Sequence, residues 1–183
     1  MKKYINKISI SIPTGIILAG ILFPLSFASA AASFNTDPAD NPTLRVTNYT
    51  KNAGCFNCWA TSVSADAGEI ISFDIYYHNT SAETATQTML RLSLPSGASN
   101  SFDISADVWA QNAQTARGNV SVNLTSSQTL SFIPGSVFWY PNRSTSASTT
   151  LPNGQTGNEV VSGTGLNIGD IAPGWTTQGH LVL

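Results

Sequence analysis

The feature that most constrains the fold of this chain is a series of short segments in which apolar and polar residues alternate. In the segment 69–78, Ile71, Phe73, Ile75 and Tyr77 fall on one face and mainly polar residues fall on the other. A period of two is that of a β-strand with one buried face and one exposed face. No segment after residue 30 has the period of an amphipathic helix. The sequence therefore predicts an all-β fold.

Similar short runs recur along the chain, separated by turn residues such as Gly, Pro, Asn and Ser. Regular spacing of such runs is typical of a sandwich or barrel, and Ser126-Ser127 indicates a hairpin between two of them. We predict an Ig-like antiparallel β-sandwich over residues 43–183. Its expected strands are 44–49, 59–63, 69–78, 89–94, 101–109, 120–124, 130–132, 137–140, 166–171 and 179–183. The polar segment 142–157 is expected to be a long exposed loop.

The first thirty residues have the layout of a secretory signal peptide. Three lysines precede an apolar stretch that ends in Ala28-Ser29-Ala30, a small-x-small pattern that signal peptidases accept. An uncleaved membrane anchor is the alternative, because the stretch is long enough to span a bilayer. The next segment, residues 31–42, is polar and contains two prolines, so we expect a tether. These features predict an extracellular or cell-surface protein.

The charge balance excludes some partners. Without the three lysines of the first thirty residues, the rest of the chain has five basic and ten acidic residues, which gives it a formal charge of −5. A nucleic-acid-binding protein needs a basic stripe, and docking to anionic lipid needs a basic patch. We therefore expect no nucleic-acid partner. Membrane contact is expected only through an uncleaved signal segment or through an anchor beyond Leu183.

Cys55 and Cys58 are the two cysteines of the chain. Thiols of exported proteins meet an oxidising environment, which favours a local disulfide between them. A redox motif would begin a helix in a βαβ unit, and no such unit is predicted. A zinc site would need two further ligands, and His78 and His180 are far away in the sequence. The disulfide is the favoured interpretation, and the other two remain alternatives.

A few polar residues are of types that bind metal ions or take part in catalysis. Asp37 and Asp40 are weak candidates for calcium ligands, although the same residues suit turns equally well. No other cofactor is predicted. His78 and His180 have no Ser and Asp partners at a suitable spacing, and no Gly-x-Ser-x-Gly motif occurs. We expect both to be ordinary surface histidines and predict no enzymatic activity.

Trp139, Tyr140 and Trp175 are the aromatic residues singled out as binding candidates. Residues 138–140 are consecutive aromatics on an expected strand, so at least one side chain must point outward. An exposed aromatic can contact a sugar or a protein partner. The alternative is that these rings pack against the interior of the domain.

Six short turn motifs occur in order over residues 60–183. They are AGE at 67–69, YYHNT at 76–80, LPSG at 94–97, FIPGSV at 132–137, LPNG at 151–154 and IGDIAPG at 168–174. This order resembles the conserved-repeat surface domain of prokaryotes, known as domain of unknown function eleven. The resemblance implies an Ig-like module of secreted and cell-wall proteins and transfers no catalytic residues. Residues 55–58 and 100–118 depart from the family pattern.

Together these features predict a non-catalytic structural or adhesive module of a bacterial secreted or cell-surface protein. The alternative is a carbohydrate-binding accessory module of a larger secreted enzyme. The expected partner is a cell-surface glycan or protein. Because the last four residues read as the middle of a strand, we also expect the domain to be truncated at its C-terminus.

Overall fold

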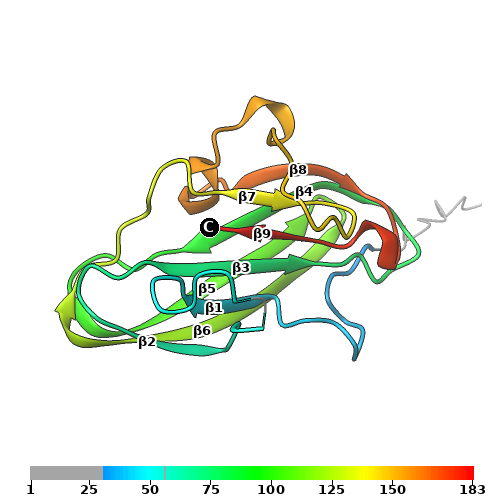
Figure 1. Ribbon diagram of the computed structural model, residues 1–183. Helices are drawn as coiled ribbons and strands as arrows, with labels where there is room; N and C mark the ends of the chain where they lie inside the picture. The colour runs from blue at the N-terminus through cyan, green and yellow to red at the C-terminus, as the bar shows by residue number, and fades with distance from the viewer. Residues whose placement is uncertain (1–30, 56) are drawn as a thin grey trace, which may run out of the picture.

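Two β-sheets lie face to face in the computed structural model, which describes residues 31–55 and 57–183 (Figure 1). The predicted signal peptide lies outside the described residues. In spatial order, the first sheet consists of β1 (Leu44–Asn48), β3 (Ile71–Tyr77), β9 (Gly179–Val182) and β7 (Phe138–Tyr140). All neighbouring strands in it are antiparallel.

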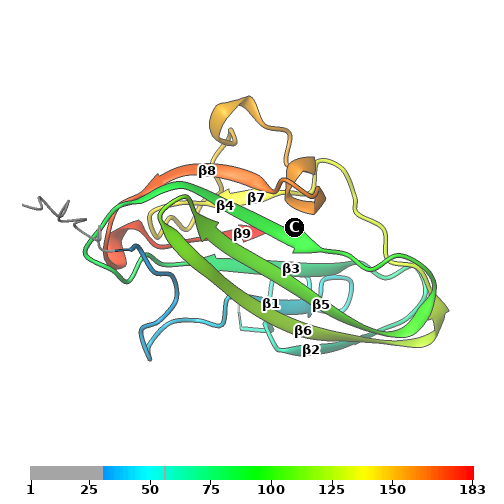
Figure 2. The same ribbon diagram turned by 180° about the vertical axis from the view of Figure 1, so that it is seen from behind.

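The second sheet has five strands and forms the opposite layer (Figure 2). Its spatial order is β2 (Ser62–Ala65), β6 (Ala113–Gln128), β5 (Ser99–Ala110), β4 (Ala85–Ser93) and β8 (Leu166–Ile171). Its neighbours are antiparallel except for β2 and β6, which are parallel. The described residues contain no α-helix, only the short 3-10 helices η1 (Pro152–Gly154), η2 (Asn158–Val161) and η3 (Trp175–Thr177). The predicted all-β, sandwich-like architecture is confirmed.

The core lies between the two sheets and follows from the alternation in the strands. Ile75 of β3 and Leu181 of β9 are fully buried, as are Leu90 of β4 and Ile104 of β5. On β5, the neighbouring residue Asp103 is exposed on the other face. Burying one face of each strand in this way supplies the main driving force for folding.

The last strand of the sequence occupies an interior position in its sheet. Leu181 of β9 lies opposite Ile75 of β3 on one side and opposite Trp139 of β7 on the other. The backbone amides of Phe73 and Leu183 donate to each other's carbonyl groups, at 2.9 and 3.0 Å. The β9 strand therefore links β3 to β7, and the sheet depends on it.

One edge of the sandwich is closed by direct contact between the sheets. Val46 of β1 and Ala60 exchange two backbone hydrogen bonds, of 2.8 and 2.9 Å, and the chain then continues into β2 of the other sheet. Gly118 of β6 packs against Leu44 of β1. A Cβ on Gly118 would lie 2.5 Å from the Leu44 backbone nitrogen, so this approach requires a glycine.

The loop between β7 and β8 covers the other edge. The Ser148 amide donates to the Trp139 carbonyl oxygen over 2.7 Å. The Gln155 side chain donates to the Asn167 carbonyl oxygen and accepts from the Asn167 amide, at 2.5 and 2.9 Å. A side-chain amide thus pairs with β8 as a neighbouring strand would. This pairing blocks a free edge, which could otherwise associate with another chain.

The segment 31–42, expected to be a tether, packs against the sandwich. Ala32 and Phe34 are buried. The Ala32 amide donates to the Asn112 carbonyl oxygen over 2.8 Å, and Phe34 forms a β-bridge with Asn79. The tether interpretation is therefore wrong for the start of this segment. Phe34, the one large apolar side chain of this polar stretch, is 3% exposed.

The hairpin expected at residues 126–127 is also wrong. These residues lie inside β6, a continuous strand of sixteen residues whose antiparallel partner is β5. The turn that reverses the chain is at Gln111 and Asn112 instead. Leu130 and Phe132, the expected return strand, lie outside the strands and still pack against the core.

Replacing Gly118 by alanine tests the close approach of the two sheets. We expect Gly118→Ala to reduce the free energy of unfolding by about 1–3 kcal/mol, because the new methyl group overlaps the Leu44 backbone. Gly163→Ala is the control, since a Cβ at Gly163 meets no atom within 4 Å. Denaturant unfolding of both variants measures the difference. Equal stabilities would contradict the packing described here.

Candidate functional site

Cys55 and Cys58 form a disulfide in the connection between β1 and β2, with their Cα atoms 5.6 Å apart. The predicted disulfide is confirmed, and neither of the two cysteines is a free thiol. Trp59, the next residue, lies beneath the Arg45 guanidinium group, whose central carbon is 5.9 Å from the ring centroid. The disulfide therefore lies in the segment through which the chain crosses from one sheet to the other.

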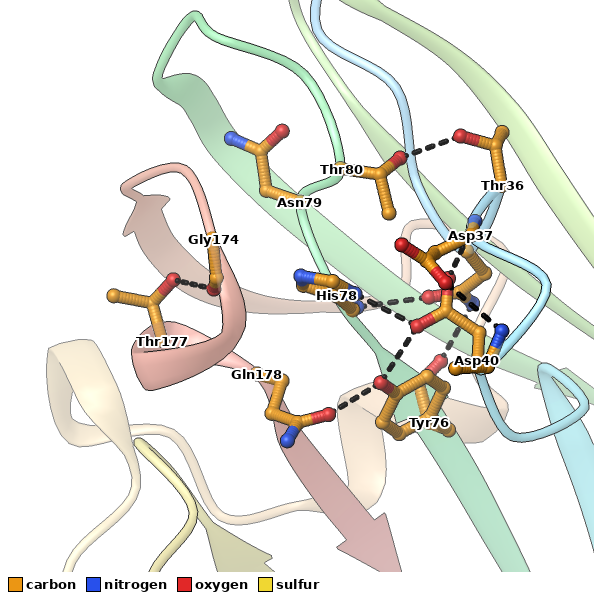
Figure 3. Close-up of polar contacts among 12 residues, drawn as sticks. Thr36, Asp37, Asp40, Tyr76, His78, Asn79, Thr80, Gly174, Thr177 and Gln178 are labelled. Atoms are coloured by element: carbon orange, nitrogen blue, oxygen red, sulfur yellow. Dashed lines mark hydrogen bonds and ion pairs between the residues drawn. The ribbon is translucent and has the colours of Figure 1, made fainter.

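A cluster of polar and aromatic side chains, of which Asp40, Tyr76 and His78 are buried, covers the outer face of β3 at its C-terminal end (Figure 3). We define the His78 cluster as Asp40, Tyr76, His78, Trp175 and Gln178. His78 Nδ1 lies 2.7 Å from Asp40 Oδ1, and the Tyr76 hydroxyl lies 2.9 Å from the same oxygen. The Tyr76 hydroxyl also contacts the Gln178 amide oxygen. Burial, together with the hydrogen bond to Asp40, raises the pKa of Tyr76.

Three separate segments bring these side chains together. Asp40 comes from the N-terminal segment, Tyr76 and His78 from the end of β3, and Trp175 and Gln178 from the connection between β8 and β9. The cluster therefore joins the beginning, the middle and the end of the described chain.

The N-terminal contribution is shaped by a turn at residues 37–40. The Asp40 amide donates to the Asp37 carbonyl oxygen over 3.0 Å, and the Asp37 amide donates to Asp40 Oδ2 over 2.9 Å. Asp37 Oδ1 accepts from the Ala39 amide over 2.8 Å. Pro38 follows Asp37, as is common in such turns. The turn directs the Asp40 carboxylate towards β3.

The two calcium candidates, Asp37 and Asp40, thus have other uses in the fold. Both carboxylate oxygens of Asp40 accept hydrogen bonds from protein donors. Within residues 31–55 and 57–183, no group of three or more His, Cys, Asp or Glu side chains gathers as a metal site would require. Calcium binding stays a prediction.

The expectation of an ordinary surface histidine is wrong for His78, whereas the His180 side chain is 29% exposed. The His78 side chain is only 2% exposed, and its ring lies against Trp175 with the centroids 4.2 Å apart. His180 Nδ1 lies 3.0 Å from Asp74 Oδ1, and its ring lies beside that of Tyr76. The polar face of β3 is covered by segments distant in the sequence, which alternation within one strand does not reveal.

Asp74 forms a second buried contact on the same face of β3. Its Oδ2 accepts from Arg45 Nη2 and Nε, at 2.5 and 3.1 Å, and its Oδ1 faces His180. Arg45 belongs to β1 and His180 to β9, the two strands that flank β3. One carboxylate therefore ties three neighbouring strands together across the outside of the sheet.

The Asp40–His78 pair resembles the acid–imidazole part of a hydrolase triad only in composition. In a triad, the second imidazole nitrogen faces a nucleophile. Here His78 Nε2 is buried and has no hydrogen-bond partner among the described residues, and Trp175 covers the ring. The arrangement joins segments of the fold, and no nucleophile among the described residues is hydrogen-bonded to His78 Nε2.

The aromatic candidates have different surroundings. Trp139 packs against the core, and its Nε1 donates to the Tyr77 hydroxyl over 2.9 Å. Tyr140 is half-buried on the edge strand β7. Trp175 is 40% exposed and covers His78 with one face. Among the described residues, no hydrogen bond or ring contact joins these three side chains. Their binding role stays a prediction.

Comparison with protein families, with curated proteins and with solved structures gives no match for this chain. In the part of the chain that the structure describes, no helix is long and apolar enough to cross a membrane.

Replacing Asp40 by alanine tests whether the His78 cluster holds the fold together. The change leaves His78 Nδ1 buried without its partner, at a cost of about 1–3 kcal/mol. It also removes the hydrogen bond between the Tyr76 hydroxyl and Asp40, so that this hydroxyl keeps only Gln178. We therefore expect Asp40→Ala to reduce the free energy of unfolding by at least about 2 kcal/mol.

The matched control is Asp103→Ala, which removes an exposed carboxylate from β5 and is expected to change the stability by less than about 0.5 kcal/mol. Urea unfolding followed by tryptophan fluorescence measures both variants. If the two variants are equally stable, Asp40 does not anchor the N-terminal segment.

Proposed function

We propose that this protein is a non-catalytic structural or adhesive module of a secreted or cell-surface protein of a bacterium. The observation that carries the proposal is the pairing of the buried acidic side chains. Asp40, Asp74 and Asp107 are each in contact with side chains from other strands or segments. These carboxylates, a type of group that catalyses reactions in many enzymes, here connect separate parts of the fold. Such a use is compatible with a module that has a mechanical or adhesive role.

We further propose that the sandwich is Ig-like. Two sheets with mainly antiparallel neighbours, and repeated crossings between them from β1 to β2 and from β3 to β4, support this relationship. The parallel pairing of β2 with β6 would be a variation particular to this chain. The order of the turn motifs in the sequence supports the same family relationship.

Export of the chain is the part of the proposal that concerns its location. The signal-like segment 1–30 and the Cys55–Cys58 disulfide both support it, because disulfides persist in oxidising compartments. In a reducing compartment the same two cysteines would be kept as thiols.

A carbohydrate-binding role is the second candidate, and the outer face of the five-stranded sheet favours it. Hydroxyl and amide side chains of β5 and β6 lie in direct register on that face. The opposed pairs are Ser101 with Asn123, Asp103 with Ser121 and Ser105 with Asn119. Sugars are recognised by arrays of such hydrogen-bonding groups combined with an aromatic ring.

The export proposal can be tested by expressing the whole chain, including residues 1–30, in a bacterial host. We expect the protein outside the cytoplasm, with a mass that corresponds to an N-terminus at Ala31. Alkylation without reductant should modify neither cysteine, and alkylation after reduction should modify both. A full-length cytoplasmic product with two reactive thiols would contradict the proposal.

A further inference from the structure

A shallow cleft of about 460 Å³ opens on the outer face of the five-stranded sheet, the face turned to the viewer in Figure 2. It is lined by Arg91 of β4, Asp107 and Trp109 of β5, and Thr115 and Arg117 of β6. None of these residues belongs to the His78 cluster, which lies on the other sheet.

The register of the strands places a carboxylate between two arginines. Asp107 lies directly opposite Arg91 on one side and Arg117 on the other. Asp107 Oδ2 accepts from Arg91 Nη2 at 2.6 Å and from Arg117 Nη2 at 3.0 Å, while Oδ1 accepts from Arg117 Nε at 2.6 Å. The Asp107 side chain is only 2% exposed. The buried carboxylate therefore fixes the orientation of both guanidinium groups.

Two arginines and one aspartate leave an excess positive charge in the cleft. The Arg117 side chain is 58% exposed, and its Nη1 has no hydrogen bond among the described residues. Arg91 Nη1 donates to the Gly163 carbonyl oxygen. Unused N–H groups of a guanidinium whose position is already fixed are well suited to a carboxylate, because little side-chain entropy is lost on binding. The cleft is thus an electropositive site on a chain that is acidic overall.

Trp109 supplies an apolar wall to the same cleft. The Arg91 guanidinium lies over its ring, 5.4 Å from the centroid. Gly165 packs against the ring edge so closely that a Cβ there would lie 2.7 Å from Trp109 Cη2. The ring is therefore held in place, and the exposed hydroxyl of Thr115 lies beside it.

We propose that this cleft binds an acidic sugar unit of a polysaccharide, with its carboxylate on the exposed guanidinium group of Arg117 and its ring against Trp109. Ser105 and Asn119, the next opposed pair along β5 and β6, supply hydrogen-bonding groups for one neighbouring sugar unit. The inference rests on the adhesive role proposed above and specifies the class of ligand.

Polygalacturonate is a suitable acidic probe, and its fully methyl-esterified form is the matched neutral probe. Binding to the exported protein can be measured by affinity electrophoresis and titration calorimetry. We expect the acidic polymer to bind at least about tenfold more tightly than the ester and to weaken as salt is added, because a charge-assisted contact is lost or screened. Equal affinity for the two polymers, or no binding to either, would overturn the inference.

Variants locate the binding. Arg117→Ala is expected to weaken binding at least about tenfold, and Arg117→Lys should restore it only in part because lysine lacks the planar fork. Arg143→Ala removes an exposed arginine in the loop after β7 and should leave the affinity unchanged. If Arg117→Ala and Arg143→Ala bind equally well, the cleft is not the site.

Arg117 also contacts Asp107, so Arg117→Ala can disturb folding. Thr115→Glu is a second variant that leaves this pairing intact and places a negative charge in the cleft. It should abolish binding to polygalacturonate while the melting temperature stays close to that of the wild type. Unchanged binding by Thr115→Glu would overturn the inference. Correct export and disulfide formation without glycan binding would refute the proposed ligand but would not contradict the proposed structural role.

Discussion

The fold depends on the burial of both faces of β3. Its inward side chains, Ile75 and Tyr77, form part of the core, and its outward side chains are buried as well. Asp74, Tyr76 and His78 on that outer face need polar partners, since a desolvated polar group without one is costly. Their partners come from β1, from β9, from the N-terminal segment and from the connection that contains η3. Providing hydrogen-bond partners for the polar side chains of this one strand therefore brings together much of the four-stranded sheet and the segments that cover its outer face.

The same chemistry has a different consequence on the other sheet. Asp107 is as deeply buried as Asp74, and both are paired with arginine. On the first sheet the partners of Asp74 come from the two flanking strands, and the Arg45 and His180 side chains are 21% and 29% exposed. On the second sheet nothing among the described residues covers Arg117, so the network that fixes it also leaves its donors facing an open cleft. Exposure of the paired cation, rather than burial of the acid, separates the candidate binding surface from the structural clusters.

Local sequence patterns predicted most of the strands, but they did not predict the contacts between segments that are distant in the sequence. Alternation located β3 and β8 well, because each has a clear apolar face. The expectation of export predicted the disulfide, because thiols pair in an oxidising compartment. The packing of residues 31–42 was missed since it depends on Phe34 and on Asp40, and neither forms a periodic pattern. His78 was misplaced for the same reason: its cover, Trp175, is far away in sequence. The Arg91–Asp107–Arg117 row became visible only with the strand register.

Native-state hydrogen exchange of the wild-type protein tests the central claim most directly, namely that the N-terminal segment is an integral part of the fold assembled on β3. The Asn35 amide donates to the His78 carbonyl oxygen and the Thr80 amide donates to the Ser33 carbonyl oxygen, at 3.0 and 2.9 Å. We predict that both amides are protected to nearly the same free energy as the amides of β5, because the segment opens only when the domain unfolds. Exchange of these two amides at the rate of an unstructured peptide, with β5 still protected, would contradict the account.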